Sequence, residues 1–198
     1  MSGGIQWLVD QADWQHGVVL ARGIEPEELG VRMGGMPGSA MSPITEAEAW
    51  AMVLDLATDD DDVVRVGACG GWSFAVEYGM NAGGDRLARI SRNGVEAIHL
   101  DPSPDHPPAM FSYARDGADV CSFGIGEEVW RWGEQPDLLL PELIAAAVLH
   151  PDGEYARPES ESYLDRDRRT LGLIETRFGL SLPRDEVVNQ RLPAFLIG

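Results

Sequence analysis

The stretch from residue 63 to residue 78 constrains the fold most, because its side chains alternate in size with a period of two. A β-rich run over residues 63–69 is followed by two glycines. In the next seven residues every second side chain is large and apolar: Trp72, Phe74, Val76 and Tyr78. Successive side chains of a strand point to opposite faces of a sheet, so the pattern predicts a strand with one strongly aromatic face. Two strands joined by so tight a turn must be antiparallel.

Other segments predict further antiparallel strands. Residues 14–22 and 95–100 are rich in β-branched and apolar side chains. Residues 110–115 and 118–123 flank Asp116-Gly117, a dipeptide typical of two-residue hairpin turns. The sequence therefore predicts an antiparallel sheet of about five or six strands.

Three helices are expected to pack on this sheet. Thr45 and Glu48 have the spacing of a capping box at the start of a helix over residues 45–57. Further helical segments are predicted over residues 141–150 and 160–178. We expect the three helices to cover one face of an α+β domain, with the other face free or covered by loops.

The length favours a single domain, and the charges are distributed unevenly along the chain. The 198 residues carry a formal net charge of -18. Residues 1–150 form an acidic α+β body with 24 acidic residues and 8 arginines, and residues 160–198 form a helical C-terminal segment packed on it. Such a charge opposes binding to nucleic acids and to anionic membranes, and it favours a basic protein partner. We expect no transmembrane span and no signal peptide, and hence a cytoplasmic protein.

Aromatic residues are the best candidates for binding such a partner. Trp130, Arg131 and Trp132 combine two aromatic rings, expected on one face of an extended segment, with an arginine, a composition typical of interface hot spots. Trp72, Phe74 and Tyr78 are a second set of possible anchors. The alternative for both sets is packing within the core.

One loop is a candidate for metal binding or catalysis. His99, Asp101, Asp105 and His106 lie within eight residues at the end of a predicted strand, and imidazole and carboxylate groups bind divalent ions. Their spacing matches no established metal motif, and an ordinary proline-rich surface loop is the alternative. The sequence has no G-x-S-x-G and no H-E-x-x-H motif.

Several short motifs together resemble a family of small actinobacterial proteins with a domain of unknown function. They are Gly71-Trp72-Ser73-Phe74-Ala75-Val76-Glu77, Leu87-Ala88-Arg89-Ile90-Ser91, Phe111-Ser112-Tyr113-Ala114-Arg115-Asp116-Gly117 and Arg131-Trp132-Gly133-Glu134-Gln135-Pro136-Asp137. The resemblance extends over residues 5–190 and implies an α+β order of elements. It implies no activity, cofactor or catalytic residue. All 15 basic residues are arginines, as expected of a GC-rich bacterial genome.

The sequence therefore predicts a non-enzymatic binding protein without a cofactor, either an immunity-type protein or a regulatory adaptor. Its acidic surface and aromatic anchors would bind a basic protein. The alternative is a small enzyme or ligand-binding domain that uses residues 99–106, with a divalent metal as its cofactor. Mimicry of nucleic acid by the acidic body is a weaker third hypothesis, because the charges form no regular rows.

Overall fold

The computed structural model describes residues 3–10, 14–56, 62–103, 107–156 and 161–198. Its strands are β1 (Val18–Arg22), β2 (Met41–Ile44), β3 (Asp62–Cys69), β4 (Trp72–Tyr78), β5 (Glu96–Asp101), β6 (Met110–Arg115), β7 (Ala118–Gly124), β8 (Arg131–Trp132) and β9 (Leu192–Ile197). Its helices are the 3-10 helix η1 (Gln6–Asp10) and the α-helices α1 (Pro26–Met33), α2 (Glu46–Asp55), α3 (Gly83–Ile90), α4 (Leu140–Ala145), α5 (Tyr163–Phe178) and α6 (Arg184–Asn189). These elements confirm the predicted α+β class.

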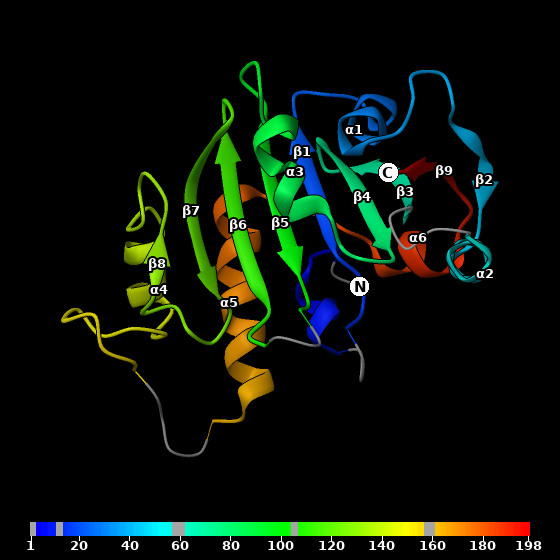
Figure 1. Cartoon of the computed structure of the whole chain (residues 1–198). Coiled ribbons are helices and arrows are strands. Elements are labelled where there is room, and N and C mark those ends of the chain that lie inside the picture. Colours follow the sequence, from blue (N-terminus) through cyan, green and yellow to red (C-terminus); the bar gives the residue numbers. More distant parts are fainter. Residues whose placement is uncertain (1–2, 11–13, 57–61, 104–106, 157–160) are drawn as a thin grey trace.

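The strands of the described residues form one nine-stranded sheet in the order β2-β9-β3-β4-β1-β5-β6-β7-β8 (Figure 1). Every neighbouring pair is antiparallel, as predicted. The predicted number of five or six strands was wrong. The missed strands have weak sequence signals, because β8 has only two residues while β2 and β9 each contain a proline, Pro43 and Pro193.

Both predicted hairpins are confirmed. Strands β3 and β4 pair from Val63 with Tyr78 to Cys69 with Trp72, around the two glycines. Strands β6 and β7 are joined by Asp116 and Gly117, whose φ angles are 54° and 85°. Two successive positive φ angles define the turn that best matches the twist of a hairpin, which explains the Asp-Gly sequence.

Helices cover both faces of the sheet. The face with the large side chains, such as Phe74, Phe111 and Phe123, packs against η1, α2, α4, α5 and α6. The opposite face has smaller side chains and packs against α1 and α3 (Figure 1). The expectation that this face is free or covered by loops was therefore wrong. Close approach is possible there because Gly30 of α1 has no side chain: an added Cβ would lie 2.3 Å from the ring of Phe195.

The C-terminal segment is not wholly helical, in contrast to the prediction. After α5 and α6 the chain enters the sheet as β9, which lies between β2 and β3. Pro193 cannot donate a backbone hydrogen bond, and the ladder between β9 and β2 is irregular around it. The last residues of the chain therefore complete the sheet of the acidic body.

The helices follow their local signals. The capping box of α2 is confirmed, because the Thr45 side chain accepts a hydrogen bond from the backbone of Glu48 and the Glu48 carboxylate accepts one from the backbone of Thr45. Helix α5 ends at Gly179, whose left-handed conformation closes the last turn. In the described part of the chain, no helix is both long and apolar enough to cross a membrane.

Candidate functional site

The best candidate for a docking site is a hollow with exposed aromatic rings at the N-terminal end of α5. We call it the aromatic hollow; its volume is about 490 Å³, and it is lined by Pro107, Pro108, Ile125, Gly126, Glu127, Trp130, Tyr155, Tyr163 and Arg166. Trp130 is 72% exposed and Tyr163 is 75% exposed. Exposed rings that share one hollow are a common feature of binding sites.

Local structure places the two exposed rings. The backbone N–H of Trp130 donates to the carbonyl of Glu127 at 2.9 Å, so Trp130 ends a tight turn just before β8. Tyr163 is the first residue of α5, and Ser162 caps that helix by accepting a hydrogen bond from the backbone of Asp165. Each ring therefore projects from the end of an ordered element.

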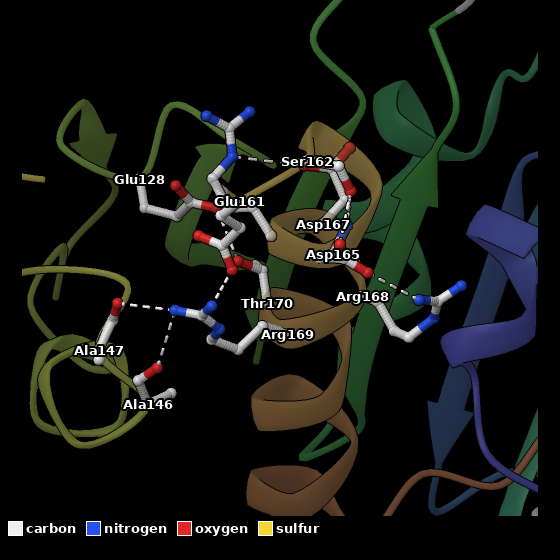
Figure 2. Close-up of polar contacts among 11 residues, drawn as sticks. Glu128, Ala146, Ala147, Glu161, Ser162, Asp165, Asp167, Arg168, Arg169 and Thr170 are labelled. Carbon is white, nitrogen blue, oxygen red and sulfur yellow. Dashed lines mark hydrogen bonds and ion pairs between the residues drawn. The ribbon is translucent and has the colours of Figure 1, made fainter. Parts of the chain in front are cut away.

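A buried carboxylate, that of Glu128, follows Glu127 of the hollow's lining in the chain and lies beside Thr170 of α5 (Figure 2). The Glu128 side chain is fully buried. Its Oε1 atom accepts hydrogen bonds of 2.7 Å from the backbone of Gly126 and from the Thr170 hydroxyl. Its Oε2 atom is buried and has no hydrogen-bond partner. A buried carboxylate oxygen without a hydrogen-bond donor is energetically costly.

Further buried charged groups lie near Glu128 on the first turn of α5. Arg166 Nε and Asp167 Oδ1 lie 3.6 Å apart, and both atoms are buried without a hydrogen bond. Burial raises the pKa of Asp167 above its usual value. Arg169 pairs with Glu161 and donates to the carbonyl of Ala147, which links α5 to the segment that follows α4 (Figure 2). This region thus places buried charged groups next to exposed aromatic rings.

Trp132 lies in a different hollow, contrary to the expectation that it shares a face with Trp130. That hollow has a volume of about 170 Å³ and is lined by Gly84, Leu87, Ala88, Ser112, Ala114, Asp119, Ser122 and Trp132. The two tryptophans diverge because Trp130 belongs to a turn and only Trp132 to a strand. Arg131 between them is held by Asp137 at 2.8 Å and by the carbonyl of Glu128 at 2.5 Å.

The second predicted set of anchors lies in the core. Trp72, Phe74 and Tyr78 are all at most 2% exposed and project from β4 toward the helices on the aromatic face of the sheet. The Trp72 indole N–H donates to the carbonyl of Phe178 at 3.3 Å, at the end of α5. The alternation that identified the strand is thus explained by packing, and these rings do not reach the surface.

The predicted metal ligands are only partly described. His99 is 3% exposed, and its Nε2 atom lies 2.9 Å from the Glu77 carboxylate. Asp101 instead accepts a hydrogen bond from the backbone of Ser103. Asp105 and His106 lie outside the described residues. Within the ranges that are described, no group of three or more potential ligands could hold a metal ion.

Comparison with protein families gives one match. Residues 6–187 match a family of unknown function, DUF6461. The chain belongs to this family. This match confirms the prediction, made from the sequence motifs, that the chain belongs to a family of unknown function. The actinobacterial origin stays a prediction. Comparisons with curated proteins and with solved structures found no match for the DUF6461 chain.

The Glu77–His99 pair should make the stability of this DUF6461 protein depend on pH, which can be tested. Burial lowers the pKa of His99, but Glu77, with Asp101 and Asp85, raises it overall above the usual 6.5. A raised pKa in the folded state means that the charged pair stabilises the fold fully below pH 6.5. This contribution is lost as the pH rises through the raised value.

We therefore expect His99→Gln to cost more stability at about pH 6 than at about pH 9. Urea unfolding of the wild type and the variant at both pH values measures this difference. His150→Gln is the control, because His150 is exposed and lies outside the pair. A cost that is independent of pH, or that grows toward alkaline pH, would contradict the charged pair.

Proposed function

We propose that this DUF6461 protein is a non-enzymatic binding protein, of the immunity or regulatory-adaptor type, that docks a basic protein partner at the aromatic hollow. The observation that carries the proposal is the exposure of Trp130 and Tyr163 in one hollow. Tryptophan and tyrosine supply much of the binding energy of protein interfaces when a partner buries them. Trp72, Phe74 and Tyr78 are excluded as anchors by their burial.

The charge of the chain supports a basic partner. A net charge of -18 attracts cationic proteins over long distances and accelerates their association. At the hollow itself, the exposed Glu127 offers a carboxylate beside the Trp130 ring. An aromatic face next to a carboxylate suits a guanidinium or ammonium group of the partner.

A contact between a guanidinium group and an aromatic ring already occurs within the chain at this hollow. The Arg166 guanidinium carbon lies 5.1 Å from the centre of the Tyr163 ring. No arginine of the described residues lies over Trp130 in the same way. Among the described residues, the Trp130 face is thus left without a cation, and we propose that the partner supplies one.

A reducing compartment fits this proposal, and we place the protein in the cytoplasm of an actinobacterium. Cys69 and Cys121 are both free thiols. Burial raises the pKa of the Cys121 thiol to about 11, so it remains protonated and unreactive.

Trp130→Ala should weaken binding of the partner at least about tenfold, because its indole ring is 72% exposed in the hollow and available for a partner to bury. The partner is first captured from a lysate of the source organism at low salt and identified by mass spectrometry. Its dissociation constant is then measured with the purified proteins at low and high salt. Binding should weaken as salt rises, because exposed charges are screened.

Trp132→Ala is the matched control, since it removes a tryptophan that lines the other hollow. Equal affinities of the wild type and of Trp130→Ala would refute docking at the aromatic hollow. Binding that is indifferent to salt would refute electrostatic attraction of a basic partner.

The alternative function, a small enzyme or metal-binding domain, depends on residues 99–106. In the structure His99 is already engaged by Glu77, which weakens this alternative. Elemental analysis of the purified protein tests it directly: a stoichiometric divalent metal that is lost in His99→Ala would favour the alternative over the binding function.

A further inference from the structure

Three arginines converge at the other end of α5, far from the aromatic hollow. Arg22, Glu96 and Arg115 are register partners across β1, β5 and β6, so they form one row at the end of these strands. Arg177 approaches from the last turn of α5. Helix α5 has 16 residues, so about 20 Å separates this site from the aromatic hollow.

These side chains enclose a second hollow, which we call the arginine hollow. Its volume is about 240 Å³, and it is lined by Arg22, Glu96, Tyr113, Arg115, Val120, Gln135, Leu138, Arg177 and Phe178. The lining combines apolar residues, Val120, Leu138 and Phe178, with polar and charged ones. A concave site with an apolar wall and a few convergent polar groups is typical of small-molecule binding.

The charges of the arginine hollow do not balance. Arg22 donates to the carboxylate of Glu96, which also accepts a hydrogen bond of 2.8 Å from the Tyr113 hydroxyl. Arg177 pairs with Glu142 at 3.2 Å, outside the lining. The Arg115 side chain forms no hydrogen bond and no ion pair with any residue that the structure describes. The lining therefore holds three guanidinium groups and one carboxylate, and a second carboxylate, that of Glu142, pairs with Arg177 from outside it.

This imbalance stands out in a chain with a net charge of -18. Clustered arginines repel one another, and their planar groups match carboxylates and phosphates with two parallel hydrogen bonds. We propose that the arginine hollow binds a small organic anion, whose carboxylate or phosphate group is held by Arg115 and Arg177 while its apolar body contacts Phe178, Leu138 and Val120.

The ionisation of the lining groups supports this proposal. Burial and the neighbouring Glu96 raise the pKa of Tyr113 to about 12, so its hydroxyl stays protonated. Burial would raise the pKa of Glu96, but the hydrogen bonds from Tyr113 and Arg22 lower it overall. The carboxylate is thus fixed as the acceptor of those two donors, and the site keeps a net positive charge at neutral pH.

Three probes of similar size test the proposal by nuclear magnetic resonance of the full chain. Phenyl phosphate and phenylacetate carry the two anionic groups, and benzyl alcohol is the neutral analogue. We expect at least one anion to cause saturable shifts of the backbone amides of residues 113–120 and of Gln135, Asp137 and Leu138. Which anion binds more tightly distinguishes a phosphate site from a carboxylate site.

Arg115→Gln should weaken binding of the preferred anion about tenfold, because a charge-assisted hydrogen bond is lost. This variant should fold normally, since Arg115 is exposed and unpaired within the described chain. Arg177→Gln provides a second variant. Arg92→Gln is the matched control, because Arg92 is exposed and lies outside the hollow.

The absence of saturable shifts with both anions would overturn the proposal. So would equal binding of benzyl alcohol, or the same affinity in Arg115→Gln and Arg92→Gln. None of these results depends on the partner proposed for the aromatic hollow, so the two proposals can fail separately.

Discussion

Phe74→Ala is expected to lower the free energy of unfolding by about 4 kcal/mol. The ring is fully buried on the aromatic face of the sheet. It lies against the backbone of β3 at Gly67, where an added Cβ would lie 2.4 Å from the ring. This close fit leaves neighbouring backbone on one side of the ring, and backbone cannot move in to fill a cavity as a flexible side chain can.

Urea unfolding of the two proteins measures this loss, and Trp130→Ala is the matched control. Trp130 is 72% exposed, so its removal should change stability by less than about 0.5 kcal/mol. The pair of variants separates a core aromatic residue from a docking one. A loss of less than about 1 kcal/mol for Phe74→Ala would contradict the packing described for β4.

The contrast between Phe74 and Trp130 shows how far the sequence could predict the site. Alternation along residues 72–78 correctly predicted the strand and its aromatic face. It could not decide whether that face was exposed, because the helix that covers it, α5, begins 85 residues after Tyr78. Trp130 and Trp132 looked equivalent in the sequence, but the turn that ends at Trp130 directs them into different hollows.

The arginine hollow had no sequence signal at all. Its arginines lie at positions 22, 115 and 177, and only the strand register and the end of α5 bring them together. Glu128 was missed for a similar reason, because a single glutamate in an acidic chain gives no indication of burial. Its neighbour Gly126 and the distant Thr170 supply its hydrogen bonds. Local patterns thus predicted the elements, while contacts between distant segments determine the sites.

Strand β9 is a further feature that local patterns missed, and a buried arginine fixes it in place. Arg65 of β3 is fully buried. It donates to the Tyr78 hydroxyl at 2.7 Å and to the carbonyls of Ile44, Val187 and Gln190 at 3.2, 2.9 and 2.6 Å. The accepting carbonyls belong to the end of β2, to α6 and to the segment that leads into β9. One side chain therefore joins three segments that are distant in the sequence.

Arg65→Met should destabilise the protein by about 3 kcal/mol, although methionine keeps much of the apolar stem. The buried carbonyls lose their donors and cannot reach water, and each unsatisfied acceptor is costly. The removal of a buried charge offsets part of this loss. Urea unfolding measures the change, and Arg92→Met, at an exposed position, should change stability by less than about 0.5 kcal/mol.

The region in which Arg65→Met loses stability distinguishes a local role, fixing β9, from a general loss of packing. Hydrogen exchange of Arg65→Met should accelerate most in residues 184–197, since α6 and β9 depend on the Arg65 contacts. Exchange in β6 and β7, at the other end of the sheet, should increase only by the global loss of stability. Uniform acceleration across the sheet would show that Arg65 stabilises the whole fold without fixing the C-terminal strand. Local acceleration would show that the arginine compensates for the weak strand signal of a segment interrupted by Pro193.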